Sequence, residues 1–440
     1  MEDSLKAVRG RFFSRGAHVP DNKALTKDNP IEVIDAQDLV LISLGQHIGK
    51  PAEPVVNIGD EVFAGQLIGK ETGFVSANIY SSVSGVVEGI EERPNPNGTK
   101  STYVIIRNDK EYHTTTLLPM DNKDPQSIIA RVREAGIVGM GGAGFPTAVK
   151  LAPKTPVDTL IINGAECEPY LTCDYRLMLE KTEEVVSGIR LLAKALNVTR
   201  IYVGIELNKP KAIELFEKYD DLQVVALKKR YPMGSEKHLI YSCTGRRVPV
   251  GKLPADVGCI VDNIATCLAV YEAVELNKPL YERAMTVSGR GCVSPKNLQV
   301  RNGTSYAYLI KVCGEKENID MYVAGGPMMG PAMLSTDVYT TKTSSGFLML
   351  SNKEIDKNES GPCISCGRCA NACPMKLLPM QIDFYTQAGD YEKADKIGGV
   401  SNCISCGSCA FVCPAKRELV QSITLCKAKL AEKRRKEGNK

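Results

Sequence analysis

The spacing of apolar residues changes character along the chain. From residue 31 to about 110, short apolar runs such as IEVI, LVLISL and YVIIR are separated by Gly, Asn and Pro. Short runs bounded by turn residues are typical of strands, so this region is predicted to be a small all-β unit. Two of its segments, VVNIGDEVFAGQLIGK (55–70) and NIYSSVSGVVEGIEE (78–92), resemble each other.

A different pattern occupies residues 125–270. Helical periodicity in QSIIARVREAGI, DYRLMLEKTEEVVSGIRLLAKAL and KPKAIELFEKY alternates with the β-runs DTLIING, RIYVGIEL and LQVVAL. Alternating strands and helices predict a layered α/β domain with a largely parallel sheet. Short β-runs return in 275–350, and helical patterns surround cysteine clusters from 351 onward.

With 440 residues, the chain is long enough for two to four domains. We expect an extended polar arm (1–30), the all-β unit (31–113), the α/β domain (114–274), a β-rich domain (275–350), a helical domain (351–426) and a basic tail (427–440). The tail is either a solvated helix or an electrostatic contact with an acidic partner or anionic lipid.

The composition and the apolar stretches argue against three classes of protein: nucleic-acid-binding, secreted and membrane-spanning. Lys plus Arg (55) nearly balances Asp plus Glu (51), which gives no sign of a nucleic-acid-binding protein. The N-terminal residues lack the apolar segment of a secretory signal, so we expect a reducing compartment in which thiols persist or bind metal. The most apolar stretch (257–274) contains Asp262 and Asn263, so we expect no membrane-spanning segment.

Eight of the sixteen cysteines form two identical runs. Each run has the spacing C-x2-C-x2-C-x3-C followed by Pro, at 363–374 and 403–414. This is the bacterial ferredoxin run for paired [4Fe–4S] clusters, in which the fourth cysteine of each run ligates the other cluster. One cluster is therefore predicted to use Cys363, Cys366, Cys369 and Cys413, and the other Cys403, Cys406, Cys409 and Cys373.

Zinc is the competing ligand for C-x2-C pairs, but two identical quartets each closed by Cys-Pro favour iron–sulfur clusters. Two clusters close together can conduct electrons. The other eight cysteines have no ligand spacing and are predicted to be buried thiols; they are Cys167, Cys173, Cys243, Cys259, Cys267, Cys292, Cys313 and Cys426.

A glycine-rich segment, GIVGMGGAGFPTAVK, spans Gly136 to Lys150. Its backbone can approach a phosphate closely and offer it several N–H donors, although a glycine-rich turn without a ligand fits the spacing as well. Downstream, a predicted strand ends at Asn163-Gly164 and two carboxylates follow, Glu166 and Glu168. Such carboxylates suit recognition of nucleotide hydroxyls, and a solvated acidic turn is the alternative.

These motifs resemble a known family. GMGGAGFPTAVK followed by NGAECEP is similar to the flavin and NADH signature of the NADH-binding subunit of respiratory complex I. The similarity continues through GSEKHLIYSCTGRRVPVGKLPADVG and VDNIATC. With GAHVP, IYSSVSG, YPMGSEK, GGPMMG and the paired cysteine runs, nearly the whole chain resembles the RnfC family, the peripheral subunits of Rnf ion-translocating ferredoxin:NAD oxidoreductases.

The resemblance implies a multidomain α/β plus β fold. It consists of a barrel-sandwich hammerhead like that of biotinyl and lipoyl domains, a complex I-like Rossmann-type α/β domain, a β-grasp (SLBB-like) domain and a helical double-cluster ferredoxin domain. Biotinyl and lipoyl carriers present a Met-Lys pair at a hairpin tip. Here that region reads KETGFVSAN, so a structural or docking role is expected.

The resemblance also implies cofactor-binding residues. FMN is expected on the glycine loop, with further residues around its phosphate, ribityl chain and ring; these are Gly139, Gly141, Gly142, Ala143, Gly144, Lys150, Asn163, Asn263 and Thr266. NAD(H) is expected near Phe145, with Glu166, Glu168 and Glu236 among its polar contacts. Ala165 stands where complex I enzymes commonly have Asp, and Tyr170 replaces a Gly.

The implied function is electron transfer between NAD(H), FMN and the two clusters, with ferredoxin as the other redox partner, directly or through a partner subunit. The implied partners are other Rnf subunits, including integral membrane ones and an iron–sulfur subunit, which couple the reaction to Na⁺ or H⁺ export. The expected location is peripheral, on the cytoplasmic face of the cell membrane.

Two alternatives remain open from the sequence. One is a soluble flavin and iron–sulfur reductase of similar build, such as a cobalamin reductase or a proline-reductase electron donor. The other is an electron-wiring adaptor that has clusters but no working flavin site.

Overall fold

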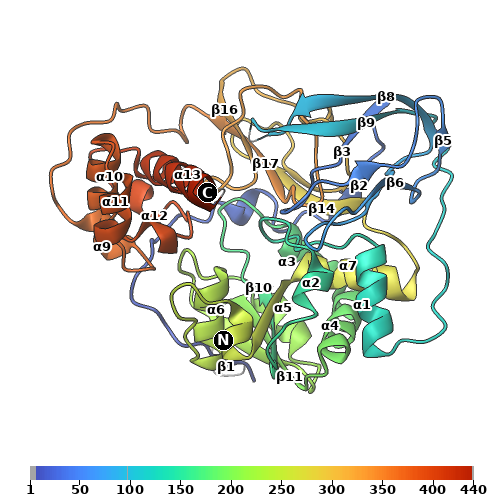
Figure 1. Ribbon diagram of the computed structural model, residues 1–440, viewed down its shortest axis with the longest axis horizontal. Coiled ribbons are helices and arrows are strands. Elements are labelled where there is room, and N and C mark those ends of the chain that lie inside the picture. The colour runs from blue at the N-terminus through green and yellow to red at the C-terminus, as the bar shows by residue number, and fades with distance from the viewer. Residues whose placement is uncertain (1–5, 97, 439–440) are drawn as a thin grey trace.

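The computed structural model describes residues 6–96 and 98–438. Residues 1–5 of the predicted arm and 439–440 of the predicted tail lie outside the described residues. The described residues form four sheets, helices that pack on the largest parallel sheet, and a separate helical region at the C-terminal end (Figure 1).

The central sheet is parallel throughout, in the order β1-β12-β11-β10-β13. Its strands are β1 (Val8–Arg9), β10 (Thr159–Gly164), β11 (Arg200–Glu206), β12 (Gln223–Leu227) and β13 (Cys259–Asn263). The helices of this domain are α1 (Pro125–Glu134), α2 (Thr147–Lys150), α3 (Cys173–Glu180), α4 (Thr182–Leu196), α5 (Pro210–Phe216), α6 (Glu236–Thr244) and α7 (Ile264–Glu275), with a 3₁₀ turn at Pro254–Val257.

Both faces of this sheet are covered, as the uninterrupted apolar runs predict for a parallel sheet. Leu160 and Ile162 pack into the core formed with α1, α3, α4, α5 and α7. Between them Ile161 points to the other face, where α6 packs. The predicted α/β layering is therefore correct, although the single helical pattern at 174–196 is two helices, because Lys181 leaves the helical conformation (φ −131°, ψ 35°).

The predicted all-β unit contains two sheets. One has the order β3-β9-β8-β5 and the other β4-β6-β7. The strands are β3 (Leu39–Ser43), β4 (Glu53–Pro54), β5 (Glu61–Val62), β6 (Leu67–Lys70), β7 (Ile79–Tyr80), β8 (Gly85–Pro94) and β9 (Lys100–Asn108). They enclose a small aliphatic core of their own.

A third region has a mixed five-stranded sheet, β16-β17-β14-β15-β2. It consists of β14 (Glu282–Ser288), β15 (Lys296–Arg301), helix α8 (Tyr306–Cys313), β16 (Ile319–Ala324), β17 (Gly346–Ser351) and β2 (Ile31–Val33). The prediction that the IEVI run belongs to the all-β unit is wrong, because Ile31–Val33 pairs in parallel with Asn297–Gln299 of β15. Edge pairing over such a sequence separation leaves no local signal.

The N-terminal segment also differs from a free arm. Val8–Arg9 extends the central sheet, and a 3₁₀ turn at Lys23–Leu25 buries Lys23. Between them, Arg15 Nη1 donates to the carbonyl of Ala370 (2.8 Å) in the helical region. The segment therefore ties the α/β domain to the C-terminal region.

The C-terminal region lies to one side of the sheets (red in Figure 1) and contains the cysteine runs. Its helices are α9 (Arg368–Ala372), α10 (Pro379–Gln387), α11 (Tyr391–Gly398), α12 (Ser408–Phe411) and α13 (Leu419–Gly438), with a 3₁₀ turn at Val400–Asn402. The described part of the basic tail continues α13 without a break. No helix in the described part of the chain combines the length and apolar character needed to cross a membrane.

Candidate functional site

The glycine-rich loop lies over the carboxyl end of the parallel sheet. Gly139 N donates to Phe145 O (2.8 Å), which closes the loop, and Met140 N donates to Thr266 Oγ1 (3.0 Å) at the start of α7. Gly141, Gly142 and Ala143 between them are exposed. Backbone N–H groups of such a loop are available to an anionic ligand.

Two asparagines form the edge beneath this loop. Asn163, near the end of β10, is the register neighbour of Asn263, which ends β13. A Cβ on Gly141 would lie 2.9 Å from Asn263 Nδ2, so the loop passes this side chain closely enough to require glycine. Asn163 is held by a bond from its Nδ2 to Gly234 O (2.8 Å).

Both β-rich regions support the loop from behind. Gly144 has a φ of +72°, and a Cβ there would lie 2.9 Å from Thr343 Cγ2 and 3.1 Å from Gln46 O. Ile48 N donates to Gly144 O (3.3 Å). From the mixed sheet, Arg283 Nη1 donates to Met140 O (3.1 Å). The loop is thus fixed by contacts that no local sequence pattern reveals.

Lys150 supplies positive charge at the end of α2. Its Nζ donates to Val261 O (2.7 Å) and lies 3.4 Å from Asp262 Oδ1. Burial disfavours the charged amine, yet the carboxylates of Asp262 and Glu236 outweigh it and leave the pKa of Lys150 raised. Lys150 is therefore a fixed cation beside the loop. Asp262, which is fully buried, is a site residue that the sequence reasoning missed although it lies in the quoted VDNIATC motif.

The two carboxylates after β10 do not form a solvated acidic turn, because the side chain of Glu166 is buried and Glu168 is partly buried with protein hydrogen bonds. Glu168 has both oxygens occupied: Tyr231 Oη donates to Oε1 and Met328 N to Oε2, both at 3.1 Å. Glu166 Oε2 lies 3.6 Å from Lys23 Nζ. Burial raises the pKa of Glu166 to about 7 and that of Glu168 to about 6.

The residues predicted to contact NAD(H) consequently differ in their exposure and in their hydrogen-bond partners. Phe145, at the end of the loop, is partly exposed, and Glu236 is exposed at the first residue of α6. Glu168 instead holds Tyr231 to the GGPMMG segment (325–330). The predicted FMN-binding residues lie together in the structure. The carboxylate of Glu168 instead points away from them and is hydrogen-bonded to Tyr231 and Met328.

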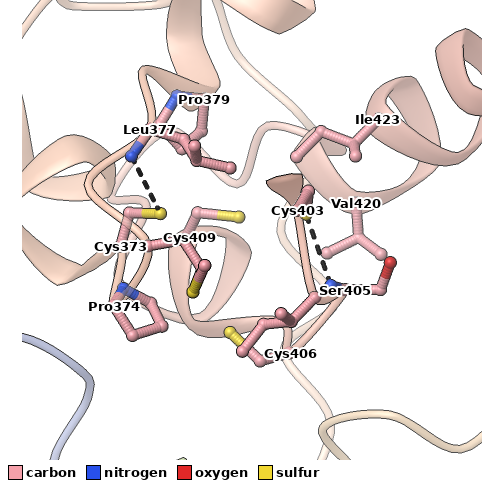
Figure 2. A pocket seen from close by; sticks show the side chains of 13 residues that line it. Cys373, Pro374, Leu377, Pro379, Cys403, Ser405, Cys406, Cys409, Val420 and Ile423 are labelled. Atoms are coloured by element: carbon pink, nitrogen blue, oxygen red, sulfur yellow. Dashed lines mark hydrogen bonds between the residues drawn. The ribbon is translucent and has the colours of Figure 1, made fainter. Parts of the chain in front are cut away.

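The cysteine runs form two cavities, each with sulfurs from both runs. Cys373 lines one cavity with Cys403, Cys406 and Cys409, and their side chains converge on a common space (Figure 2). Cys413 lines the other with Cys363, Cys366 and Cys369. Four thiols around one cavity are a donor set that fits a [4Fe–4S] cluster, and the grouping is the crossed one that the spacing predicts.

Backbone amides support the sulfurs of the first cavity. Leu377 N donates to Cys373 Sγ and Ser405 N to Cys403 Sγ, both at 3.3 Å (Figure 2). Burial, followed by the charges of neighbouring cysteines, raises the pKa of Cys409 to about 12. Deprotonation of such a thiol at neutral pH requires a bound cation, as metal ligation supplies.

This first cavity adjoins both the α/β domain and the mixed-sheet region, whereas the second is further toward the solvent. His238 Nε2, on α6 of the α/β domain, lies 3.3 Å from Pro374 O. On the mixed-sheet side, a Cβ on Gly407 would lie 2.6 Å from the carbonyl oxygen of Met328. Cys363 and Cys366 of the second cavity are exposed.

The remaining cysteines are mostly buried, as predicted. Cys173, Cys259, Cys267, Cys292, Cys313 and Cys426 are buried, and Cys167 and Cys243 are partly buried.

Family models match three separate parts of the chain. Residues 11–111 match the RnfC barrel sandwich hybrid domain, 132–272 the Nuo51 FMN-binding domain and 362–417 the 4Fe-4S dicluster domain. The predictions of a barrel-sandwich unit, an FMN-binding α/β domain and a double-cluster domain are thereby confirmed.

Similar chains are known over almost the full length. The C-subunit of the proton-translocating ferredoxin:NAD(+) oxidoreductase complex of Clostridium ljungdahlii is 46% identical, over 96% of this chain and 94% of the relative. The C-subunit of the ion-translocating oxidoreductase complex of Rhodobacter capsulatus is 45% identical, over 95% and 83%. The C-subunit of the Na(+)-translocating ferredoxin:NAD(+) oxidoreductase complex of Acetobacterium woodii is 40% identical, over 98% and 100%.

Proposed function

The chain belongs to the C-subunit (RnfC) family of ion-translocating ferredoxin:NAD oxidoreductase complexes, and on this premise we propose that it carries electrons between NAD(H) and the rest of such a complex. FMN and two [4Fe–4S] clusters are its cofactors. We call the loop Gly139–Gly144, with Asn163, Asn263 and Thr266 beneath it, the flavin cradle. The observation that carries the proposal is the presence, in one chain, of this cradle and of two four-thiol cavities, one of which adjoins the cradle's domain.

The cofactors suit this task because nicotinamide exchanges two electrons as hydride, a cluster exchanges one, and flavin does both. The protein supplies position and charge. The loop from Gly139 to Gly144 offers backbone N–H groups to the FMN phosphate, and Lys150 provides a cation beside it. Asn163, Asn263 and Thr266 are the polar groups of the sheet edge assigned to the ribityl chain and ring.

NAD(H) is assigned to the open side of the loop. Phe145 and Glu236 are accessible there, so they are the residues we assign to nicotinamide nucleotide contact. Glu166 and Glu168 were expected in the same role. Their burial supports an indirect role instead, through the side chains that they hold.

Each cluster takes three ligands from one run and one from the other. Cys373, Cys403, Cys406 and Cys409 hold the cluster near the flavin domain. Cys363, Cys366, Cys369 and Cys413 would hold the second, outer cluster, and two of these ligands, Cys363 and Cys366, are exposed. Exposure of the outer cluster suits transfer to another protein.

The finer domain assignments follow the same family. We assign residues 275–350 to a β-grasp, SLBB-like domain because two hairpin-like strand pairs flank helix α8 in one mixed sheet. The α/β domain (114–274) is assigned as Rossmann-type, with its ligand at the carboxyl ends of parallel strands. The barrel-sandwich unit (31–113, apart from Ile31–Val33, which joins the mixed sheet) is assigned to docking on partner subunits.

The partners are the other subunits of the complex. They include integral membrane subunits that move Na⁺ or H⁺ and an iron–sulfur subunit, and ferredoxin is the other redox partner. The chain itself would then lie on the cytoplasmic face of the membrane, held by its partners.

Purified protein tests the proposal. After anaerobic reconstitution with iron, sulfide and FMN, it should show flavin absorbance, bind about eight irons per chain and reduce an artificial acceptor with NADH. Protein that takes up iron but neither binds FMN nor oxidises NADH would be an adaptor, and the proposal would fail. Recovery with integral membrane proteins separates a complex subunit from a free-standing reductase.

A further inference from the structure

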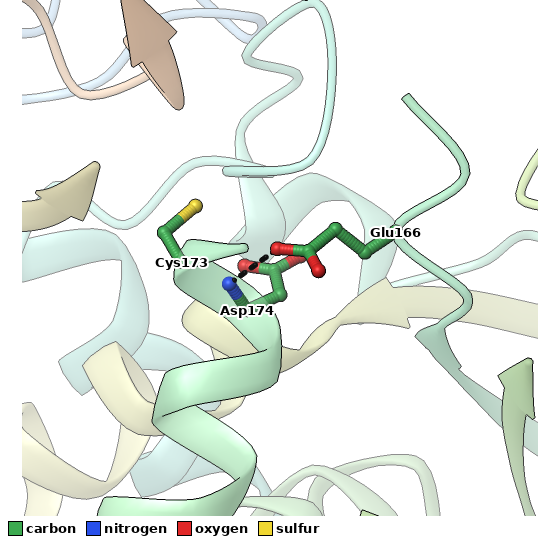
Figure 3. A group of neighbouring side chains, drawn as sticks. All are labelled: Glu166, Cys173 and Asp174. Carbon is green, nitrogen blue, oxygen red and sulfur yellow. Dashed lines mark hydrogen bonds between the residues drawn. The ribbon is translucent and has the colours of Figure 1, made fainter. Parts of the chain in front are cut away.

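A pair of buried carboxyl groups lies beside the flavin cradle. Glu166 follows β10 and Asp174 lies in the first turn of α3, and Figure 3 shows their side chains facing each other. Asp174 N donates to Glu166 Oε1 (2.7 Å). Oxygens of the two carboxyl groups and the sulfur of Cys173 lie within 4.8 Å of one another. The Glu166 side chain is only 4% exposed and Asp174 only 8%.

One oxygen of this pair has no hydrogen-bond partner among the described residues. Glu166 Oε2 is buried and receives no donated proton. Lys23 Nζ lies 3.6 Å away but donates to the carbonyls of Glu168 and Leu171. A buried carboxylate oxygen without a donor is costly, and a proton on it removes the charge.

The charges around the pair do not make it a metal site. Lys23 faces Glu166, and Lys209 lies behind it, 3.8 Å from Glu206 Oε2 and bonded to Ala165 O (2.6 Å). These ammonium groups already supply positive charge from two elements, which disfavours a metal cation.

Two groups face the pair from the other side. The Cys173 thiol donates to Ser345 O (3.3 Å), so it is occupied as a protonated thiol. Arg283, on β14, donates from its Nη1 to the carbonyls of Met140 and Lys342, so its charge interacts with Asp174 only at longer range. No cation among the described residues therefore pairs directly with Asp174.

Electrostatic repulsion between two carboxylates in a buried site favours the state in which the pair holds one proton over the state in which both groups are ionised. Two neighbouring carboxyl groups cannot both ionise easily in a low dielectric, as in proteins where such pairs are catalytic. Burial raises the pKa of both Glu166 and Asp174, and the charge of Asp174 raises the pKa of Glu166 further. Lys23 and Lys209 act in the opposite direction on both groups, and the Asn263 hydrogen bond and Arg283 do so on Asp174.

The pair is connected to the cradle through one side chain. Asn263 Nδ2 donates to Asp174 Oδ2 (2.6 Å), and a Cβ on Gly141 would lie 2.9 Å from that same nitrogen. Asp174 is therefore one hydrogen bond away from the residue over which the glycine loop passes. Charge that arrives in the cradle acts on the pair through this short connection.

We propose that Glu166 and Asp174 are a proton-storing pair that keeps one proton at neutral pH and takes up a second when the neighbouring flavin is reduced. This inference rests on the proposed flavin chemistry. Arrival of a hydride brings two electrons and one proton to the flavin and adds one negative charge to the site. The remaining carboxylate of the pair then takes a proton from hydronium or a buffer acid in the solvent. One O–H bond forms on the carboxylate, one bond to hydrogen breaks in the donor, which leaves as water or the conjugate base, and no electron reaches the pair.

The pH dependence of the flavin midpoint potential tests this. Each proton taken up with two electrons changes the potential by about 30 mV per pH unit. Around neutral pH, the wild-type protein should show about 60 mV per pH unit, for one proton on the flavin and one on the pair. In Glu166→Gln and in Asp174→Asn, the slope of the flavin midpoint potential should fall to about 30 mV per pH unit, while both variants still bind FMN.

Glu272→Gln is the matched control. Glu272 is also a partly buried carboxylate of this domain, but it pairs with Lys278 (2.8 Å) at the far end of α7 from Asn263. This variant should keep the wild-type slope. An unchanged slope in both Glu166→Gln and Asp174→Asn would overturn the inference, since the second proton would then reside on the flavin.

A measurement without flavin covers variants that lose the cofactor. Infrared spectra of flavin-free wild-type protein at neutral pH should contain the carbonyl band of a protonated, buried carboxylic acid, and Glu166→Gln should abolish it. Absence of the band from the wild type, or its persistence in both variants, would refute the pair. Failure of the wild type to bind FMN would instead refute the proposed function and leave this band unaffected.

Discussion

Lys342 provides a test of how the flavin cradle is held in place. It is fully buried where the mixed sheet, the barrel-sandwich unit and the α/β domain meet. Its Nζ donates to Asn78 O (2.6 Å) and to Gly136 O (2.7 Å) at the start of the glycine segment. Burial lowers the pKa of this amine to about 7. We expect Lys342→Met to alter stability in a manner that depends on pH.

The sign follows from proton linkage. The unfolded chain has its ordinary lysine pKa of 10.5, so between pH 7 and 10.5 it binds a proton that the folded chain lacks. The folded state therefore gains stability as pH rises through this window. The difference between 10.5 and 7, at 1.36 kcal/mol per pH unit, comes to about 5 kcal/mol, of which about 3 kcal/mol falls below pH 9.

Methionine has no titratable group, so the free energy of unfolding of the variant lacks this increase with pH. Urea unfolding should be followed by far-UV circular dichroism, because the chain contains no tryptophan. Between pH 7 and about pH 9, the free energy of unfolding of the wild type relative to Lys342→Met should rise by about 3 kcal/mol. The FMN affinity of the variant should also fall, since Gly136 O and Asn78 O lose their donor.

Lys278→Met is the control for alkaline effects in general. The carboxylates of Glu272 and Glu282 raise the pKa of Lys278 despite its partial burial, so this lysine stays charged throughout the range in both states. Its difference from the wild type should not change with pH. A pH-independent difference for Lys342→Met as well would show that the buried amine keeps its proton, and the reasoning would be wrong.

Three further substitutions test the loop, the clusters and the helical domain. Gly144→Ala should weaken FMN binding about tenfold, because left-handed strain costs about 1–2 kcal/mol. Gly73→Ala, outside the loop, has no positive φ and its Cβ would lie 3.7 Å from the nearest atom, so it should bind FMN normally in the same titration; equal losses would contradict this. Cys413→Ala should halve the iron content and remove the EPR signal of the cluster built on the first run, and loss of the other signal would exclude crossed ligation. Asp383→Ala removes the buried carboxylate that accepts from Arg417 (2.7 Å) and from Ser422 (2.6 Å), and should lower the unfolding free energy by about 2 kcal/mol in urea titrations. Asp383→Asn keeps an acceptor at the same place and should lose less; equal losses would show that the hydrogen bonds contribute nothing beyond the charge.

Features with a local cause were predictable from sequence. The cysteine spacing determines which sulfurs can meet because the two runs are short, tight loops. The β-runs of the central sheet were recognisable because strands covered on both faces are continuously apolar. The glycine segment was recognisable because close backbone approach requires residues without a Cβ.

Features created by distant segments were not predictable. Val8–Arg9 pairs with β12 more than two hundred residues away, and Lys342 reaches the carbonyl of Gly136 from the loop that precedes β17. Neither contact alters the local pattern of polar and apolar residues. A buried lysine in particular is indistinguishable in sequence from a surface lysine, because its partners are carbonyls that every residue has.

The two carboxylates after β10 show why even a correct motif can mislead about roles. The family resemblance implied that Glu166 and Glu168 both contact NAD(H), and side chains two residues apart in an extended segment would indeed point to the same side. Glu166, however, has a φ of +43°, which breaks the extended geometry. Its carboxylate consequently faces Asp174 and the flavin cradle, while that of Glu168 faces Tyr231 and the segment packed against the cluster loop. If this turn gives the two glutamates different roles, Glu166→Gln should alter the pH dependence of the flavin potential. Glu168→Gln should instead alter the potential of the cluster held by Cys373, Cys403, Cys406 and Cys409 more than that of the flavin.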